Sequence, residues 1–363
     1  MTRLLAFYLP QYHPIPENDA WWGAGFTEWN NVAKAKPLFP GHYQPHLPGE
    51  LGFYDLRLPE TRKAQAELAR SHGIHGFIYY HYWFEGRLLL ERPLREVLES
   101  RQPDLPFCIC WANHNWSRTW TGSTEELLLE QRYSLEDDRE HIRWLLPYLK
   151  DPRYITVAGK PVVFFYRAQH IHHLPETVRL WQQEAKSAGL PGLYLSWVEG
   201  NHPSETPDLT GQGFDAACEF QPRTGTAGPP LPTWLRGRLR TLAPAAFRRH
   251  HVRDYARLVE GALAREAAPY KRFPCVTPAW DNSARRAPSR SANVWIGSTP
   301  ALYERWLRTT LERFTPFGPD EDFVIVNAWN EWAEGNHLEP DRKWGRAYLE
   351  ATRRALDASQ RGC

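Results

Sequence analysis

The sequence has few cysteines, and they are odd in number and scattered along the chain. Five occur in 363 residues, and no CxxC pair is present. A disulfide framework or a zinc ribbon would need cysteines paired at short spacing. The odd, scattered set therefore predicts reduced core residues of a cytosolic protein. They are Cys108, Cys110, Cys218, Cys275 and Cys363.

Long apolar runs are also missing. No stretch approaches the roughly 20 apolar residues that a membrane-spanning helix needs. The opening MTRLLAFYLPQYHP has an apolar run too short for a secretory signal, and Pro10 interrupts it. The formal net charge of +2 gives no reason to expect a nucleic-acid partner. We therefore expect a soluble cytoplasmic protein.

The sequence signatures of cofactor and metal chemistry are absent as well. There is no HExxH, no Cys/His zinc spacing, no GxSxG and no Walker loop. The three histidines in QHIHH (169–173) have no acidic cluster near them in the sequence. The acidic triplet 320–322 precedes an apolar run, whereas the DxD motif of metal-dependent transferases would follow one. We expect no cofactor and no metal ion.

Short apolar runs, in contrast, recur along the chain. Runs this short and this apolar are typical of strands buried on both faces of a parallel sheet. Helical patterns separate them, such as 59–72, which opens on a proline and is followed by Gly73. The eight runs are 4–8, 76–81, 107–112, 162–166, 193–198, 216–220, 274–280 and 323–329.

Eight alternating β and α units predict an α/β fold, a (β/α)8 barrel formed by a single domain over 1–363. A doubly wound sheet with a dinucleotide site is disfavoured, because YLPQYHP stands where a glycine-rich loop would follow the first strand. A minimal barrel takes about 250 residues, so about 110 remain for loops. The long connections 9–58, 113–134 and 221–272 all leave the carboxyl ends of strands, where barrel active sites form.

The connection 221–272 differs from the rest in charge. It carries eleven Lys and Arg residues against three acidic ones, a net charge of +8. We read it either as a solvated helical insertion or as a lid. A patch for an anionic glycan, a lipid phosphate or a membrane surface is a further alternative.

Aromatic residues are abundant, with 17 Trp and 16 Tyr, and many stand with polar residues at strand ends. Most aromatics fill cores, but they also stack on the apolar faces of sugar rings. If these strand ends meet at one barrel mouth, they form a cleft suited to a carbohydrate. The candidate lining residues are Tyr8, Tyr12, His13, His81, Tyr82, Trp83, Trp111, Asn113, His114, Trp116, Tyr166, Trp197, Glu199, Glu219, Trp280, Asp281, Asn282, Asn330 and Trp332.

The last of these strand ends, NAWNEWAEG (327–335), carries two acids three residues apart. On a helical turn Glu331 and Glu334 would share one face. Two nearby carboxylates in a partly apolar site acquire different pKa values, which is the acid and base division that glycosidic cleavage uses. The alternative is that acids at a helix start only favour its dipole. The flanking tryptophans favour the catalytic interpretation.

Five segments carry a family resemblance that extends over almost the whole chain. They are AFYLPQYHPIPENDAWWGAGFTEWNNVAKAKPLFPGHYQPHLP (6–48), GIHGFIYYHYWF (73–84), PFCICWANHNWSRTW (106–120), TPAWDNSARR (277–286) and NAWNEWAEGNHLEP (327–340). The chain resembles the WbsX-type family of lipopolysaccharide and polysaccharide biosynthesis proteins. That family is described as similar to glycoside hydrolase family 99 and is sometimes labelled as glycosyltransferases.

The resemblance implies a site and a reaction. Family 99 contains retaining endo-α-mannosidases and endo-α-mannanases on a (β/α)8 barrel. Glu331 would be the base on the substrate 2-hydroxyl, giving a 1,2-anhydro-sugar, and Glu334 the general acid and base. Ala333 stands where family 99 enzymes tend to have His, and the loop with Glu28 and Trp29, which we add to the candidate lining, looks like a WbsX feature. Both departures put mannose specificity in doubt.

Three functions stay open on the sequence. The first is a glycoside hydrolase-like enzyme acting on an α-linked bacterial glycan through Glu331 and Glu334. The second is a glycosyltransferase of O-antigen, lipopolysaccharide or capsule assembly, and the third is a glycan-binding protein without catalysis. The expected partner is an oligo- or polysaccharide. The basic segment 221–272 could bind a lipid-linked glycan or hold the protein at the periphery of the inner membrane.

Overall fold

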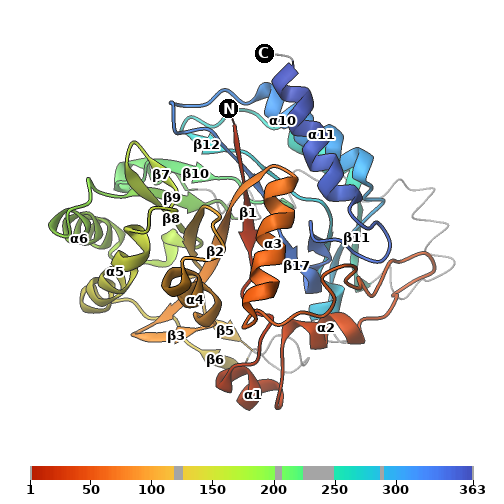
Figure 1. Cartoon of the computed structure of the whole chain (residues 1–363), viewed down its shortest axis with the longest axis horizontal. Coiled ribbons are helices and arrows are strands. Elements are labelled where there is room, and N and C mark those ends of the chain that lie inside the picture. The colour runs from red at the N-terminus through yellow and green to blue at the C-terminus, as the bar shows by residue number, and fades with distance from the viewer. Residues whose placement is uncertain (1, 118–125, 201–206, 224–248, 287–289, 362–363) are drawn as a thin grey trace.

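Eight parallel strand positions form the centre of the molecule, with helices around them (Figure 1). The computed structural model describes residues 2–117, 126–200, 207–223, 249–286 and 290–361. Neighbouring strands follow the chain order, as in a barrel. They are β1 (Arg3–Tyr8), β2 (Ile74–Phe84), β4 (Phe107–Trp111), β8 (Lys160–Phe165), β9 (Tyr194–Val198), β10 (Ala216–Cys218), β12 (Arg272–Phe273) with β13 (Cys275–Val276), and β16 (Phe323–Val326).

The barrel closes through the seventh strand position, which Pro274 divides into β12 and β13. β12 pairs with β10 on one side, and β13 pairs with β16 on the other. Proline has no N–H to donate, but its carbonyl accepts from the Ile325 N–H at 2.8 Å. β16 then pairs with β1. The predicted (β/α)8 barrel is therefore confirmed.

Helices cover the outside of the barrel. Proline stands in the first turn of α3, and the Ser134 and Thr299 hydroxyls accept backbone N–H groups at the starts of α5 and α10, as stable helix starts require. The helices are α3 (Pro59–Ser71), α4 (Arg92–Ser100), α5 (Leu135–Leu149), α6 (Leu174–Ser187), α9 (Tyr255–Leu263), α10 (Pro300–Arg313) and α11 (Ala347–Arg361). Between β9 and β10 the structure describes 199–200 and 207–215, and these residues contain the 3-10 turn η3 (Thr210–Gln212) but not the α-helix we expected in the fifth unit.

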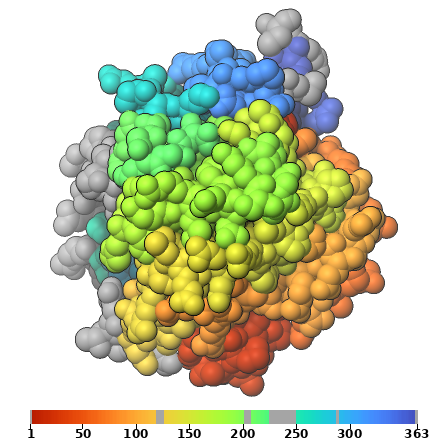
Figure 2. All heavy atoms as spheres, turned by 90° about the vertical axis from the view of Figure 1, so that its left-hand side faces the viewer, coloured from red at the N-terminus to blue at the C-terminus, as the bar shows by residue number. Residues whose placement is uncertain are grey.

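Loops at the carboxyl ends of the strands carry their own short elements. The first loop holds α1 (Pro16–Trp22) and α2 (Glu28–Lys34), and β5 (Trp116–Ser117) pairs with β6 (Leu127–Leu129). In Figure 2 the red first loop lies beside the yellow part of the chain that follows β4. The other short strands are β3 (Arg87–Leu89), β7 (Thr156–Val157), β11 (His251–Asp254), β14 (Trp280–Asp281), β15 (Asn293–Ile296), β17 (Asn330–Glu331) and β18 (Asn336–His337).

The basic segment 221–272 is only partly an insertion. Its helix α9 packs against α10 and is the barrel's own sixth helix. Residues 224–248, with four of the eleven basic positions, lie outside the described residues. Described cations of this segment contact protein groups: Arg223, Arg265 and Arg272 contact acidic side chains, Lys271 pairs with Glu321, and Arg253 lies over Trp295.

No helix among the described residues has the length and apolar character needed to cross a bilayer.

Candidate functional site

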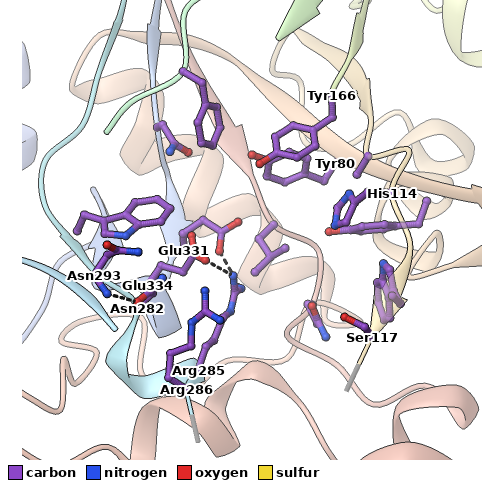
Figure 3. Close-up of a pocket in the computed structure, with 18 of the residues that line it drawn as sticks. Tyr80, His114, Ser117, Tyr166, Asn282, Arg285, Arg286, Asn293, Glu331 and Glu334 are labelled. Carbon is purple, nitrogen blue, oxygen red and sulfur yellow. Dashed lines mark hydrogen bonds and ion pairs between the residues drawn. The ribbon is translucent and has the colours of Figure 1, made fainter. Parts of the chain in front are cut away.

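A pocket of about 450 Å³ opens at the carboxyl ends of the strands (Figure 3). One wall carries Tyr80, Tyr166 and His114, and the opposite wall carries Glu331 and Glu334 with Arg285 beneath them. The pocket is thus aromatic on one side and charged on the other. A few convergent polar groups in an aromatic cleft are the usual composition of a small-ligand site.

The alternation of β2 sets the aromatic wall. Successive side chains of a strand point to opposite faces, so Tyr80 and Tyr82 face the pocket. His81 and Trp83 point outward to α5, where the His81 Nε2 lies 2.9 Å from the His141 Nε2 and the Trp83 indole donates to Asp137 at 2.9 Å. The single run Tyr80–Trp83 therefore serves both the site and the outer packing.

A hairpin after β16 delivers the two acids. Glu331 ends β17, and Glu334 ends the 3-10 turn η5 (Trp332–Glu334). Gly335 then adopts φ 56°, and a Cβ there would lie 3.1 Å from the Asp281 Cβ, so the turn requires glycine. The Asn330 side chain fixes the base of the hairpin, because it accepts from the Leu9 N–H at 2.7 Å and donates to the Leu9 carbonyl at 3.0 Å.

Arg285 joins three carboxylates in this site. Its Nη2 lies 2.8 Å from Glu331, its Nη1 2.9 Å from Glu334, and its Nε 3.1 Å from Glu28. The three acids come from the first and last loops, and Arg285 ends the turn η4 (Asn282–Arg285) of the seventh. The single positive charge of Arg285 thus faces up to three negative charges, so the cluster is anionic when all three acids are ionised.

Burial dominates the electrostatics of the cluster. Burial raises the pKa of Glu331, Arg285 acts in the opposite direction, and the charges of Glu334 and Glu28 add to the rise. Burial also raises the pKa of Glu28, again against Arg285. The three carboxylates hold the pKa of Arg285 above its usual range despite its burial. A carboxyl with a raised pKa is a stronger base when ionised, which suits proton transfer near neutral pH.

Eight of the residues singled out on the sequence line this pocket. They come from the second, third, fourth, seventh and eighth strand ends and from the loops that follow them. The Asn282 side chain also accepts the Asn293 N–H at 2.9 Å and so closes its loop. The eight are Tyr82, His114, Trp116, Tyr166, Trp280, Asn282, Glu331 and Glu334.

Other candidates point outward into the layer between barrel and helices. Tyr8 donates to Gln65 of α3 at 2.7 Å, Trp111 stacks on Trp181 of α6, and the Trp197 ring packs on Tyr270. Direct contact with a ligand in the pocket is excluded by this orientation. The outward residues are Tyr8, His81, Trp83, Trp111 and Trp197.

A third group supports the site without lining it. Trp29 and Trp332 pack together beneath the hairpin, and each indole donates to a buried oxygen. Asp281 faces away from the pocket and accepts from His42 and Gln44, both at 2.7 Å. The predicted residues in these supporting positions are Tyr12, His13, Glu28, Trp29, Asn113, Asp281, Asn330 and Trp332.

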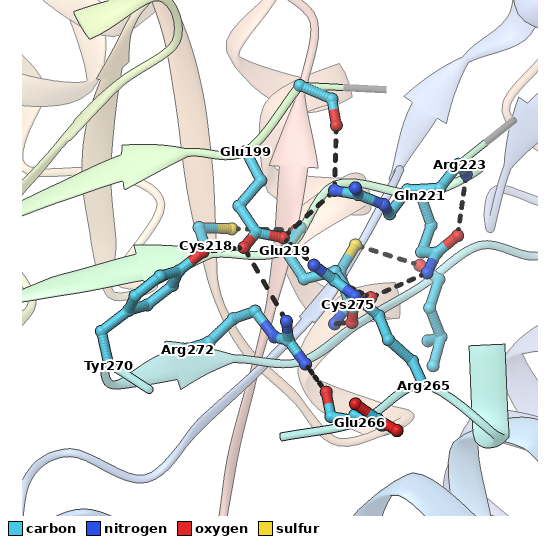
Figure 4. A network of polar contacts seen from close by, with 12 residues as sticks. Glu199, Cys218, Glu219, Gln221, Arg223, Arg265, Glu266, Tyr270, Arg272 and Cys275 are labelled. Carbon is cyan, nitrogen blue, oxygen red and sulfur yellow. Dashed lines mark hydrogen bonds and ion pairs between the residues drawn. The ribbon is translucent and has the colours of Figure 1, made fainter. Parts of the chain in front are cut away.

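Glu199 and Glu219, also predicted as lining residues, belong to a separate ionic network (Figure 4). Arg265 bridges them, at 2.7 Å from Glu199 and 2.6 Å from Glu219. Arg223 and the Tyr270 hydroxyl also contact Glu199, at 3.3 and 2.8 Å. Their negative charges are therefore compensated within the protein.

Sequence reasoning missed part of the lining. Arg285 and Arg286 stand inside the motif TPAWDNSARR but were not singled out, because nothing local indicates their acidic partners. The lining residues missed on the sequence include Phe220, Arg285, Arg286, Asn293 and Trp295.

Comparison with solved structures finds other proteins of similar fold. A structure described as a glycoside hydrolase-like protein matches with a TM-score of 0.62 and 14% identity, over 98% of this chain and 93% of the other. The GH99 endo-alpha-mannosidase from Bacteroides thetaiotaomicron matches with a TM-score of 0.56 and 17% identity, over 99% and 98%. At such identities the likeness concerns the fold.

Comparison with curated proteins finds relatives in Xanthomonas campestris pv. campestris. The "Uncharacterized protein WxcX" of strains ATCC 33913 and B100 is in both cases 42% identical over 359 residues. The alignment covers 98% of this chain but 50% of each relative, so the chain spans about half the length of these proteins. A family model described as "Glycosyltransferase WbsX" matches residues 4–352. The chain therefore belongs to the WbsX family.

Proposed function

We propose that the protein is a glycoside hydrolase-like enzyme that cleaves an α-linked bacterial glycan with retention of configuration. The observation that carries this proposal is the pair Glu331 and Glu334, held on one guanidinium at the edge of an aromatic pocket. The endo-alpha-mannosidase fold likeness supports the same class of substrate.

The first step uses both acids. Glu331, as carboxylate, takes the proton of the substrate 2-hydroxyl, and the 2-oxygen attacks the anomeric carbon. Glu334, as carboxylic acid, protonates the departing glycosidic oxygen, so the bond breaks without a free alkoxide. The product of this step is a 1,2-anhydro-sugar, and no covalent bond to the protein forms. This route differs from the usual retaining scheme, in which a carboxylate attacks the sugar directly.

The second step reverses the proton movements. Glu334, now ionised, takes a proton from water, and the water oxygen opens the anhydro ring at the anomeric carbon. Glu331 returns its proton to the 2-oxygen, which restores both acids. Arg285 supports the ionised form of Glu331, which burial alone would disfavour. Tyr80 and Tyr166 offer aromatic surface for the sugar ring opposite the acids.

A glycan-release assay tests the proposal. The protein and its Glu334→Gln variant are incubated with polysaccharide from the source organism, without nucleotide-sugar, and released oligosaccharides are read by mass spectrometry. Release by the natural sequence and by the control variant below, but not by Glu334→Gln, supports hydrolysis through Glu334. Glu219→Gln is the matched control, since Glu219 is a buried carboxylate of the separate network. Equal release by all three proteins would contradict the assignment of Glu334.

A glycosyltransferase of O-antigen, lipopolysaccharide or capsule assembly is the second candidate, because the matching family model carries that description. The acidic triplet 320–322 offers this reading no donor site, since Asp322 pairs with Arg3 at 2.6 Å and Glu321 with Lys271. A cytoplasmic protein at the inner membrane, meeting a lipid-linked glycan through the segment 221–272, would suit this candidate. A thermal shift with nucleotide-sugars, absent with free nucleotides, would favour it over hydrolysis.

A further inference from the structure

A second pocket, of about 360 Å³, lies behind the hairpin that carries Glu331 and Glu334. The two pockets share the walls Trp280 and Trp295. His46, His337 and Asp341 all line the second pocket, and each is less than a tenth exposed. Nothing in the reaction proposed above uses these three side chains.

The three side chains converge on one point. Each offers one ligand atom, and these atoms lie within 4.8 Å of one another. The His46 Nδ1 and the His337 Nε2 are 3.1 Å apart. If an ion lay at the usual zinc–nitrogen distance of about 2.0–2.1 Å from both nitrogens, the nitrogen–metal–nitrogen angle would be roughly 100°, close to the tetrahedral value.

The protonation of the two imidazoles suits a cation. The His337 Nδ1 lies 2.9 Å from the Glu339 carbonyl and donates to it, so the His337 Nε2 presents a lone pair to the cluster. A ligand histidine fixed through its other nitrogen in this way is the usual arrangement at metal centres. The His46 Nδ1, 3.1 Å away, donates its proton to this lone pair.

The carboxylate is oriented as well. Asp341 Oδ1 accepts the N–H groups of Lys343 and Trp344, at 3.0 and 2.6 Å, and Oδ2 accepts from the Tyr43 hydroxyl at 3.1 Å. Each oxygen of a carboxylate has two lone pairs, so Oδ2 keeps one for a ligand. The donor set is two imidazole nitrogens and one carboxylate oxygen.

We propose that His46, His337 and Asp341 form a binding site for one divalent transition-metal ion of the Zn²⁺ class. Magnesium and calcium are disfavoured because they prefer oxygen ligands, whereas imidazole suits zinc and its neighbours. Three protein ligands leave a further position facing the pocket, for water or a small anion. On binding, the proton of the His46 Nδ1 moves to its Nε2, so the ion replaces the hydrogen bond between the two rings without a change in their total charge.

The ion would fix the hairpin of the first pocket from behind. His337 lies in β18, directly opposite Asn330 in β17, and the next pair in the register is Glu331 with Asn336. His46 belongs to the first loop and Asp341 to the segment after β18. An ion bound by all three therefore links three segments around the strand that carries Glu331. This role is independent of the reaction that Glu331 and Glu334 perform.

Metal stoichiometry tests the site without reference to activity. The full chain is freed of metal with a chelator, equilibrated with Zn²⁺, desalted and measured by elemental analysis and titration calorimetry. We expect one zinc per chain, and His337→Gln should weaken binding by about 100-fold or more, since even loss of an outer partner costs 10–100-fold. Co²⁺ should give a visible absorption band in the natural sequence that the variant lacks.

Two further variants keep the test decisive. His173→Gln removes a histidine that pairs with Asp138 at 3.1 Å outside the cluster, and it should bind zinc as the natural sequence does. Tyr43→Phe keeps the ring and removes the hydroxyl that donates to Asp341, so it should fold normally and bind about tenfold more weakly. Absence of stoichiometric zinc in the natural sequence, or equal binding by His337→Gln, Tyr43→Phe and His173→Gln, would overturn the proposal.

Discussion

Arg285 and Glu331 form an ion pair of 2.8 Å between the seventh and last loops of the barrel, 46 residues apart in the sequence. Both side chains are largely buried, so neither charge is well solvated without the other. Glu331 has a candidate catalytic role, and the positive charge of Arg285 favours its ionised form. The pair therefore connects the stability of the barrel mouth to its proposed chemistry.

Loss of Arg285 should destabilise the protein in a pH-dependent way. Arg285→Met leaves the buried carboxylates of Glu28 and Glu331, and the half-buried Glu334, without their cation, and breaking a buried pair costs about 3–5 kcal/mol. Without the guanidinium the pKa values of Glu28 and Glu331 rise further, so these two carboxyls are protonated to a greater extent at pH 5 than at pH 8 and the cost falls. Urea unfolding at pH 8 and pH 5 measures both values. Arg346→Met, which breaks an exposed pair with Glu50, should cost less than about 1 kcal/mol at either pH. An equal cost at both pH values for Arg285→Met would contradict this account.

Glu331→Gln should make the protein more stable at alkaline pH. The pKa of Glu331 is raised on folding, so between its unfolded and folded pKa the folded state binds more protons. Stability therefore falls as pH rises through that interval, and the loss remains above it. A glutamine does not titrate and avoids this loss. Thermal unfolding of both proteins from pH 4 to pH 9 should give curves that separate as pH rises. Parallel curves would show that Glu331 does not titrate in this range.

Glu28→Gln should shift the pH dependence of the proposed reaction. Glu28 is fully buried and pairs with Arg285, as Glu331 does. The negative charge of Glu28 raises the pKa of Glu331. Removing that charge lowers the pKa of Glu331, so the acidic limb of kcat/KM should move to lower pH. KM should change little, because Glu28 does not line the pocket. Glu50→Gln, at an exposed position, is the control. If the acidic limb of kcat/KM in Glu28→Gln stayed at the same pH as in the natural sequence, Glu28 would have no influence on the pKa of Glu331.

His81→Gln should affect stability and leave glycan binding unchanged. His81 is 2% exposed and its ring stacks on Trp144 and contacts His141, away from the pocket. We expect a loss of about 1–3 kcal/mol in the free energy of unfolding and a dissociation constant within about twofold of the natural value. Trp280→Ala removes an aromatic wall and should weaken binding about tenfold, equivalent to about 1.4 kcal/mol. Calorimetric titration with the released oligosaccharide compares the two, and a weaker affinity in His81→Gln would contradict the placement of its ring.

The fold could be predicted from the sequence because its signals are local. Each of the eight apolar runs contains the core of a barrel strand, and the predicted helix 59–72 lies within a residue of α3. The fifth unit was the exception. Its helix was inferred from the repeat of the other units, and the described part of that connection contains a 3-10 turn instead.

The candidate site was predictable in part, for a reason that lies in the strands. A strand buried on both faces is apolar and aromatic on both, so composition does not tell the inner side from the outer. Tyr82 and His81 were both expected at the ligand, yet the period of two sends one to the pocket and the other to α5. Glu199 and Glu219 were also expected there, but they meet arginines of the segment 221–272, a pairing without any local signal.

The barrel, its long loops and the family could be predicted from the sequence, since each rests on patterns within short segments. The three-dimensional fold was needed to show which strand residues face the pocket, and that Arg285 joins Glu28, Glu331 and Glu334. It alone also brought His46 to His337 and Asp341. The physical reason is the same in each case. Charge pairs and ligand clusters form between loops that barrel closure brings together. Their energies depend on distance and burial, and no short segment of the sequence reveals either quantity for residues on different loops.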